Sequence, residues 1–287
     1  TVLPIGNVAM PDHVSGKSIV ITGAGSGFGR LVAGKAAAHG AKVTLGDINA
    51  AALDAAVAEI RAQGGIAQGV VTNVTDLAAM KALVAAAVTN HGGIDVMVNN
   101  AGVMPLAFYA DHVAAYDAWV RCIDINFKGV LNGMVAAYDP MIAAGRGQMV
   151  NVSSIYGNFP TVGAAVYGAT KAAVNVLGES LRLEARGKIK VTTVKPTGVF
   201  GTGLGGTVVN GDGLAGILGG NAAAANEVFA GLVAGTIDPA RIDPEGIDYA
   251  NLDPRFIADA IIYAIDQPWG VSIGEVTVRA AGDYYIL

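Results

Sequence analysis

Two kinds of segment alternate along most of this chain, and that alternation limits the possible fold more than any other feature. Short apolar runs rich in β-branched residues predict buried parallel strands at 18–22, 42–46, 66–71, 94–98, 148–152 and 189–194. Longer stretches rich in alanine and leucine predict helices between them, at 29–39, 50–63, 77–91, 114–144 and 164–186. Because such crossovers are right-handed, the helices would cover both faces of one sheet. We therefore expect a single α/β domain with a doubly wound parallel sheet and a ligand crevice at the carboxyl ends of the strands.

The composition suits a large buried core and argues against several kinds of partner. Of the 287 residues, 53% are hydrophobic and 14% are charged, which is far from the composition of disordered chains. The formal net charge of −5 is spread without basic or acidic blocks, so we expect no nucleic acid and no membrane as partner. No membrane-spanning helix and no secretory signal are expected, and the default location is cytoplasmic. The single Cys122 and the scattered histidines predict no metal site.

The regular pattern fails between residues 201 and 251. Glycine clusters there flank one helix candidate at 222–234, among apolar residues such as Val208, Leu214 and Phe229. A long irregular segment inside a domain is usually functional, and this mixture predicts a mobile lid over an apolar substrate. A surface insertion without a function is the alternative. Beyond the segment we expect a last helix at 254–266, a last strand at 275–280, and an apolar tail, 281–287, that a neighbouring subunit could cover.

A glycine-rich turn follows the first predicted strand and opens the first predicted helix. It reads Thr22-Gly-Ala-Gly-Ser-Gly-Phe-Gly29 and includes Gly23, Ser26, Gly27 and Phe28. In this context glycines let the backbone approach a pyrophosphate group that is held at the helix N-terminus. The turn alone is a weak signal for a dinucleotide, so the next strand has to support it.

Asp47 ends the second predicted strand and supplies that support. A carboxylate there can accept hydrogen bonds from the adenosine ribose hydroxyls and would repel a 2′-phosphate, so NAD is favoured over NADP as the cofactor. Arg30 keeps NADP open as an alternative. Asp47 could instead be the N-cap of the following helix, although Asn49 could supply that cap.

Three polar side chains predict proton transfer. Tyr167 and Lys171 are four positions apart on a predicted helix and so share one face, which would let the ammonium group stabilise a phenolate. An unperturbed tyrosine, with a pKa of about 10, would be a poor base at neutral pH. Ser154 lies thirteen positions before Tyr167, at the end of the fifth predicted strand, and could hydrogen-bond a substrate oxygen. The alternative role of Lys171 is that of an ordinary solvated helix residue.

Together these motifs resemble the short-chain dehydrogenase/reductase family, in its single-domain branch with a Rossmann fold. The resemblance spans nearly the whole chain. Its marks are the glycine-rich turn, Asn99-Asn-Ala-Gly102, Asn126, Ser154, Tyr167-x-x-x-Lys171 and the turn Pro196-Thr-Gly198. Two positions depart from the usual pattern, because Asn73 stands where the family commonly has aspartate and Thr197 interrupts its Pro-Gly pair.

The resemblance implies a role for each matching residue. Asn126, Ser154, Tyr167 and Lys171 would form the catalytic set, in which Asn126 binds a water that connects Lys171 to solvent; packing or capping is its alternative role. The cofactor contacts implied by the family, in addition to the glycine-rich turn, are Asp47, Ile48, Asn73, Val74, Asn100, Ala101, Gly102, Tyr167, Lys171, Pro196, Gly198, Val199 and Thr202. For Asn100, Ala101 and Gly102, a simple turn after the fourth strand is the alternative.

The expected function is NAD-dependent interconversion of a secondary alcohol and a ketone, on an apolar and ring-bearing substrate. Residues after the fourth and fifth strands would line its pocket unless they are ordinary core residues: Met104, Phe108, Tyr109, Tyr156 and Phe159. A carbonyl reductase acting in the opposite direction and a dinucleotide-sensing protein without turnover are the alternatives. The family also implies a homodimer or homotetramer.

Overall fold

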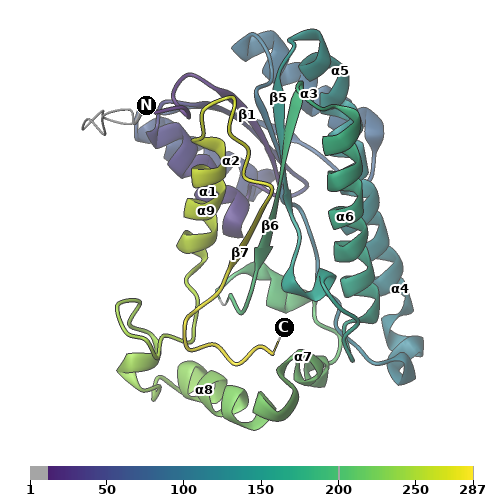
Figure 1. Ribbon diagram of the computed structural model, residues 1–287, viewed down its shortest axis with the longest axis vertical. Coiled ribbons are helices and arrows are strands. Elements are labelled where there is room, and N and C mark those ends of the chain that lie inside the picture. The colour runs from purple at the N-terminus through teal and green to yellow at the C-terminus, as the bar shows by residue number, and fades with distance from the viewer. Residues whose placement is uncertain (1–11, 200, 287) are drawn as a thin grey trace, which may run out of the picture.

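The computed structural model describes residues 12–199 and 201–286, which contain one seven-stranded parallel sheet with helices on both sides (Figure 1). The strand order is β3-β2-β1-β4-β5-β6-β7. The strands are β1 Ser18–Thr22, β2 Lys42–Asp47, β3 Ile66–Val71, β4 Val96–Asn99, β5 Gly147–Val152, β6 Ile189–Pro196 and β7 Glu275–Val278. The doubly wound parallel sheet is confirmed. Since β1 pairs with both β2 and β4, the direction of winding reverses beside β1, which is where such folds bind their ligands.

The helices form two layers, one against each face of the sheet (Figure 1). One layer contains α1 Gly27–Ala38, α2 Ala50–Ala62 and α9 Pro254–Ile265. The other contains α3 Leu77–His91, α4 His112–Cys122, α5 Gly129–Ala143 and α6 Ala165–Glu184. Two short 3₁₀ turns, η1 Tyr109–Asp111 and η3 Ile155–Gly157, follow β4 and β5.

Alternating side chains of the central strands supply both cores. In β1, Ile19 and Ile21 pack against the layer of α1, α2 and α9, whereas Val20 packs against the layer that contains α3 and α5. Successive residues of a strand point to opposite faces, so a strand that is covered on both sides must be apolar throughout. The fully buried run of β1 shows why the sequence pattern identified these strands.

The predicted helix 114–144 contains a π-helical turn that the sequence did not indicate. It is made of α4, the π turn Ile123–Lys128 and α5 without a break between them. Gly129 N donates to Asp124 O, the i to i+5 bond that defines such a turn. π turns are often found at functional sites, and this one contains Asn126.

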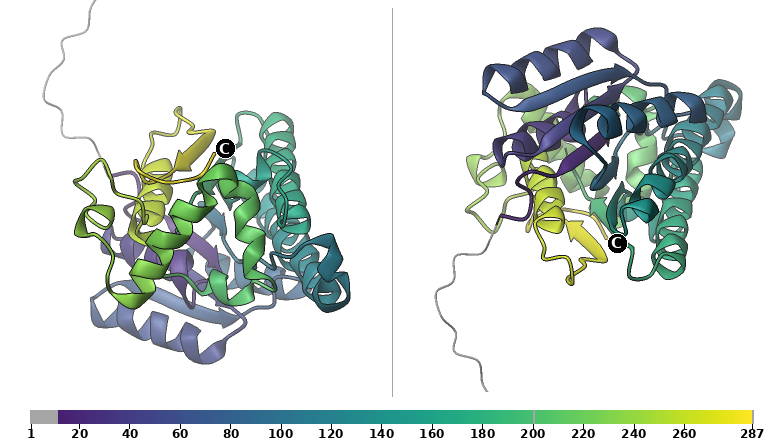
Figure 2. Two further views of the ribbon diagram at one scale, coloured as in Figure 1. Left: turned by 90° about the horizontal axis from the view of Figure 1, so that it is seen from below. Right: turned by 90° about the horizontal axis from the view of Figure 1, so that it is seen from above.

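Residues 201–251 cross the carboxyl end of the sheet as a set of short helices (Figure 2, left). They are η4 Gly203–Thr207, η5 Gly211–Leu214, α7 Ala215–Leu218, η6 Gly219–Asn221, α8 Ala222–Ala234 and η7 Pro239–Arg241. The bounds of α8 are those predicted. By length and composition the stretch Gly211–Ala234 could cross a membrane, contrary to the expectation that no segment could. Gly219, with a φ of +53°, interrupts that stretch, so it is not one straight helix.

The C-terminal tail packs in part on its own chain, while Ile286 is 57% exposed, so cover by a neighbouring subunit stays a prediction. Tyr284 and Tyr285 join an apolar cluster beside the carboxyl end of the sheet. Asn221 Nδ2 donates to Tyr284 O at 3.1 Å, and Ile286 N donates to Ile217 O at 3.5 Å. The tail therefore connects β7 to the helices of the 201–251 segment.

Candidate active site

A cleft of about 1060 Å³ opens at the carboxyl ends of the strands, under the 201–251 segment. It exceeds the usual range of about 300–1,000 Å³ for a small-molecule site, so it has room for a dinucleotide and a substrate together. Every predicted cofactor residue except Gly29 lines it, and so do Ser154, Tyr167 and Lys171. Gly29 and Asn126 do not line it.

The glycine-rich turn is built for close approach of backbone to ligand. Gly23 and Gly27 have φ values of +63° and +52°, which favour glycine. A Cβ on Gly29 would overlap the carbonyl oxygen of Gly23, so the start of α1 can pack on the turn only without a side chain. Asn100 Nδ2 holds the turn in place by donating to Thr22 O at 2.9 Å and to Gly23 O at 3.2 Å. Asn100 therefore supports the turn, a role that the sequence did not predict, and it also lines the cleft.

The first turn of α1 is open to an anion. Its N-cap, Ser26, makes no side-chain capping hydrogen bond, so the amide groups at this helix end are not covered by their own cap. Ser26 and Gly27 both line the cleft. Uncapped amides and the helix dipole at such a position favour a phosphate group.

Asp47 lies beside this turn at the end of β2. Its Oδ2 accepts from Gly25 N at 2.8 Å and its Oδ1 accepts from Asn49 N at 2.9 Å, which leaves lone pairs on both oxygens. Asn49 is the N-cap of α2 and accepts from Ala52 N, so the alternative of Asp47 as that cap is wrong. The guanidinium group of Arg30 is paired with Glu59 and does not line the cleft.

The adenine end of the cleft is formed by Ile48, Asn73 and Val74. Ile48 is 70% exposed, which suits an apolar contact with a planar ring. Asn73 Oδ1 already accepts two hydrogen bonds from Thr75, from the amide at 3.1 Å and from the hydroxyl at 3.0 Å. The atom expected to receive the adenine amino group is therefore engaged by Thr75, and the Asn73 contact stays a prediction.

Tyr167, Ser154 and Lys171 come together as predicted. All three are buried, and the Tyr167 hydroxyl is hydrogen-bonded with Ser154. Lys171 Nζ lies 5.7 Å from the centroid of the Tyr167 ring and donates to Val152 O at 2.9 Å. The alternative of a solvated lysine is wrong, because Lys171 is only 4% exposed.

Burial controls the protonation of this group. Burial raises the pKa of Tyr167 above its ordinary value, although the hydrogen bond with Ser154 lowers it in part. The expectation that Lys171 lowers the pKa of Tyr167 below that of a free tyrosine is therefore corrected. Burial also lowers the pKa of Lys171 to about 8, since an isolated ammonium group loses its hydration. Near neutral pH the tyrosine is a neutral phenol, which is a proton donor.

Asn126 acts as a clamp on the chain after β4. Its Oδ1 accepts from Val103 N at 2.9 Å and its Nδ2 donates to Val103 O at 2.8 Å. The side chain is fully buried. A water-binding role for Asn126 would have to use its main-chain carbonyl group, because the side-chain amide already holds Val103.

The cleft also contains two features at its other end that the sequence did not reveal. Thr197 is 2% exposed and lines the cleft, yet its hydroxyl has no hydrogen-bond partner among the described residues. Pro196, Gly198, Val199 and Thr202 line the cleft beside it. The family resemblance implies that this turn holds the carboxamide group of the nicotinamide. The unpaired hydroxyl of Thr197 could hydrogen-bond such a ligand, because a carboxamide has both donors and acceptors. With the uncapped turn of α1 and the free lone pairs of Asp47, these residues fit a nicotinamide dinucleotide.

Tyr285 of the C-terminal tail is the second of these features. Its ring lines the cleft and occupies the space that a Cβ on Gly198 would need. Of the candidate substrate residues, Met104 and Tyr156 line the cleft, whereas Phe108, Tyr109 and Phe159 do not. Because Tyr285 reaches the site only through the fold of the tail, sequence spacing carried no signal for it.

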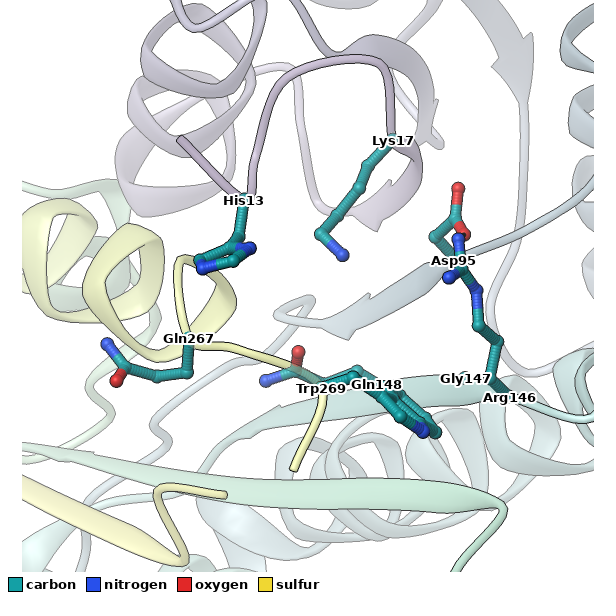
Figure 3. A pocket seen from close by; sticks show the side chains of 8 residues that line it. All are labelled: His13, Lys17, Asp95, Arg146, Gly147, Gln148, Gln267 and Trp269. Carbon is teal, nitrogen blue, oxygen red and sulfur yellow. Dashed lines mark ion pairs between the residues drawn. The ribbon is translucent and has the colours of Figure 1, made fainter. Parts of the chain in front are cut away.

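A second hollow of about 100 Å³ lies at the opposite, amino end of the strands (Figure 3). Polar side chains surround it, among them His13, Lys17, Asp95 and Arg146. Arg146 pairs with Asp95 at 3.5 Å, and none of the predicted site residues is present. Its size and position separate it from the chemistry of the large cleft.

Comparisons with known proteins agree with this geometry. The family model of the short chain dehydrogenases matches residues 17–211. The 2,5-dichloro-2,5-cyclohexadiene-1,4-diol dehydrogenase LinX of Sphingobium indicum is 38% identical over 193 residues, which are 66% of this chain and 76% of the relative. An uncharacterised oxidoreductase of Staphylococcus aureus is 32% identical over 264 residues, which are 92% of this chain and 96% of the relative. The chain therefore belongs to the short-chain dehydrogenase/reductase family and is an oxidoreductase.

Solved structures share the fold. A 7α-hydroxysteroid dehydrogenase complexed with NADH and 7-oxo glycochenodeoxycholic acid has a TM-score of 0.76 at 23% identity, covering 96% of this chain and 97% of its own. A metagenomic short-chain oxidoreductase in complex with NADP has a TM-score of 0.70 at 28% identity, covering 93% and 98%. Both neighbours hold a nicotinamide dinucleotide.

Proposed function

We propose that the protein is an NAD-dependent dehydrogenase that interconverts a secondary alcohol and a ketone. The observation that carries this proposal is the buried Tyr167, hydrogen-bonded with Ser154 and beside Lys171, in a cleft that also contains Asp47. A protein that only sensed a dinucleotide would have no use for this proton-handling group. Fold alone would not support the choice, because one fold serves many functions.

Each side chain has a separate task in the proposed reaction. Tyr167 Oη exchanges a proton with the substrate oxygen, as acid in ketone reduction and as base in alcohol oxidation. Ser154 Oγ hydrogen-bonds the same oxygen and stabilises the charge that develops on it. Lys171 carries the positive charge nearest to the phenol and is fixed by Val152 O. When bound, the nicotinamide ring supplies the hydride acceptor or donor.

The preference for NAD is supported by charge. The carboxylate of Asp47 lines the part of the cleft where the adenosine ribose would lie, and it would repel a 2′-phosphate. Arg30, the residue that could favour NADP, is paired with Glu59 on the neighbouring helix. Because the metagenomic neighbour was solved with NADP, activity with NAD should be compared with activity with NADP.

The proposed substrate is apolar and contains a ring. Met104 and Ile155 line the cleft, together with Val208, Leu214 and Phe229 of the 201–251 segment. The name of LinX, an enzyme for a chlorinated cyclohexadiene diol, supports a ring-bearing alcohol of moderate size. We propose that residues 201–251 open to admit such a substrate and close over it.

Turnover assays test this proposal. Purified protein is incubated with cyclic, aryl, aliphatic and steroidal secondary alcohols, with NAD and NADP in parallel, and reduced cofactor is measured. We expect turnover with NAD and a cyclic alcohol, and much slower turnover with NADP. Binding of NADH without turnover of any alcohol or ketone would favour a sensor instead.

We also propose that the protein is a homo-oligomer. A stripe of exposed apolar residues runs along the continuous helix α4–π–α5: Val113, Tyr116, Val120, Ile123, Leu131, Val135 and Tyr138. Their spacing of three, four, seven or eight residues keeps them on one face. Contiguous apolar surface of this kind commonly marks a protein interface. Light scattering coupled to gel filtration would show a dimer or tetramer; a monomer would refute this proposal.

A further inference from the structure

We propose that Tyr156 and Tyr285 form a second oxygen-binding subsite, which selects alcohols that carry another hydroxyl or carbonyl oxygen. The inference rests on the proposed function and specifies its substrate class. Tyr167 and Ser154 would act on the reacting oxygen of the substrate. The phenols of Tyr156 and Tyr285 would bind the second oxygen and take no part in proton transfer.

Tyr156 carries an unsatisfied hydroxyl next to the catalytic group. The residue is 7% exposed and lines the cleft, and its hydroxyl has no hydrogen-bond partner among the described residues. Its backbone N donates to Ser154 Oγ at 3.2 Å, and its ring meets the Tyr167 ring edge-on with 5.7 Å between centroids. A buried hydroxyl without a partner is unfavourable, and such groups in native proteins usually have a ligand or a functional reason.

Tyr285 brings a second phenol to the same place from the C-terminal tail. Its ring packs on Gly198, which has a φ of +60° and leaves room for the ring because it lacks a Cβ. Arg279 Nη2 donates to Tyr285 O at 2.8 Å and pairs with Asp283, so the tail is held at this position. Tyr285 packs against the apolar cluster that contains Tyr156, and both side chains line the cleft, so the two phenols belong to one part of the site.

The surroundings decide which ligand chemistry this subsite accepts. Burial raises the pKa of Tyr156 above its ordinary value and that of Tyr285 to about 12, so both are neutral donors near pH 7. Neutral phenols in an apolar cleft suit an uncharged oxygen better than a carboxylate, whose desolvation they could not offset. The charged side chains that line the cleft are Asp47, Lys171, Arg121 on α4 and Asp124 in the π turn.

The test compares diols with a matched mono-alcohol. The kcat/KM values for cyclohexane-1,2-diol and cyclohexane-1,4-diol are each divided by the value for cyclohexanol, all with NAD. For wild type we expect this ratio to exceed about ten for at least one diol, as expected for a site that hydrogen-bonds a substrate hydroxyl. Tyr156→Phe should lower the ratio about tenfold, chiefly through KM for the diol, and Tyr285→Phe should lower it in the same direction.

Controls separate recognition from structure. Tyr263→Phe removes a phenol that is 56% exposed on α9 and should leave the ratio unchanged. Because the Tyr156 hydroxyl has no partner to lose, Tyr156→Phe should unfold at the same temperature as wild type or a higher one. A lower unfolding temperature would indicate a structural role and overturn the inference.

The two proposals fail in different ways. Oxidation of cyclohexanol and diols with a ratio near one, unchanged in both variants, would overturn the subsite and leave the dehydrogenase intact. Absence of turnover with every alcohol, while NADH still binds, would overturn the proposed function and the subsite with it.

Discussion

Replacing Lys171 with methionine should abolish turnover and yet stabilise the ligand-free protein. Lys171 is 4% exposed, and its ammonium group donates to the carbonyl of Val152. None of the ion pairs formed by the described residues includes it. Methionine has a similar length and no charge, so it fills the same space without the cost of burying a cation.

The size of the effect follows from the pKa of Lys171. Burial lowers that pKa from 10.5 to about 8, and each unit corresponds to about 1.4 kcal/mol, so the charged form costs on the order of 3 kcal/mol of folding free energy. Losing the hydrogen bond to Val152 O should offset about 1 kcal/mol of this gain. The net gain of about 2 kcal/mol should raise the unfolding midpoint by roughly 4–8 °C for a domain of this size.

The pH dependence gives the sharper test. Because the folded-state pKa of this lysine is below its unfolded value, the cost is present in full below pH 8 and disappears as the pH rises to about 10.5. The advantage of Lys171→Met over wild type should therefore be large at pH 7 and small at pH 10. Stability would be measured by urea unfolding of both proteins without cofactor at each pH.

A matched control is available on the surface. Lys81 is exposed on α3, and Lys81→Met should change the free energy of unfolding by no more than about 0.5 kcal/mol at either pH. The reasoning is refuted if Lys171→Met is less stable than wild type at pH 7, or if its advantage is the same at pH 7 and pH 10.

Four further predictions concern the cleft. Tyr167→Phe should lower kcat by about 10²–10⁴-fold and leave NADH binding nearly intact; equal loss of both would contradict the acid–base role. The kcat/KM for alcohol oxidation by wild type should rise steadily from pH 7 to pH 10, because burial raises the pKa of Tyr167 and oxidation needs its phenolate; a pH-independent rate would argue against this. Asp47→Ala should shift the NAD-to-NADP preference by about tenfold or more toward NADP, and an unchanged ratio would make Asp47 structural. Gly29→Ala should destabilise the fold by about 1–3 kcal/mol and weaken NADH binding, because its Cβ would overlap Gly23 O; normal affinity would show that the turn can shift.

The strands and helices of the regular part of the fold were predictable from the sequence. Strands of a sheet that is covered on both faces are apolar throughout, and this produces a recognisable sequence pattern. The strands β1 and β3 and the helices α3 and α8 have the predicted bounds, and the other predicted elements differ by a few residues at their ends. The short helical turns and the π turn were not predicted. Local propensity and periodicity determine these elements, so sequence alone identifies them. The doubly wound topology then follows from the right-handedness of the crossovers.

The candidate site was predictable where a motif ties residue type to position. Tyr167 and Lys171 share a helix face, and Ser154 and Asp47 end strands, so the topology brings them to one edge of the sheet. Tyr285 was not predictable, because its place depends on how the tail packs on the rest of the chain.

Three further features of the site could not be predicted from the sequence pattern. The pKa of Tyr167 depends on how completely the phenol is buried, which no spacing encodes. The π turn around Asn126 has no distinct periodicity over its six residues. That the hydroxyl of Thr197 lacks a hydrogen-bond partner depends on the three-dimensional positions of the donors and acceptors around it, which the sequence does not give.

The most direct test of the central claim is to follow the hydrogen that moves. A secondary alcohol that the enzyme turns over, labelled with deuterium at the carbinol carbon, is incubated with the protein and NAD, and the NADH is analysed by mass spectrometry. We predict one deuterium in each NADH formed by wild type, and NADH formation that is slower by about 10²–10⁴-fold in Tyr167→Phe although that variant binds NADH. Unlabelled NADH, or labelled NADH formed equally well by Tyr167→Phe, would contradict hydride transfer governed by this site.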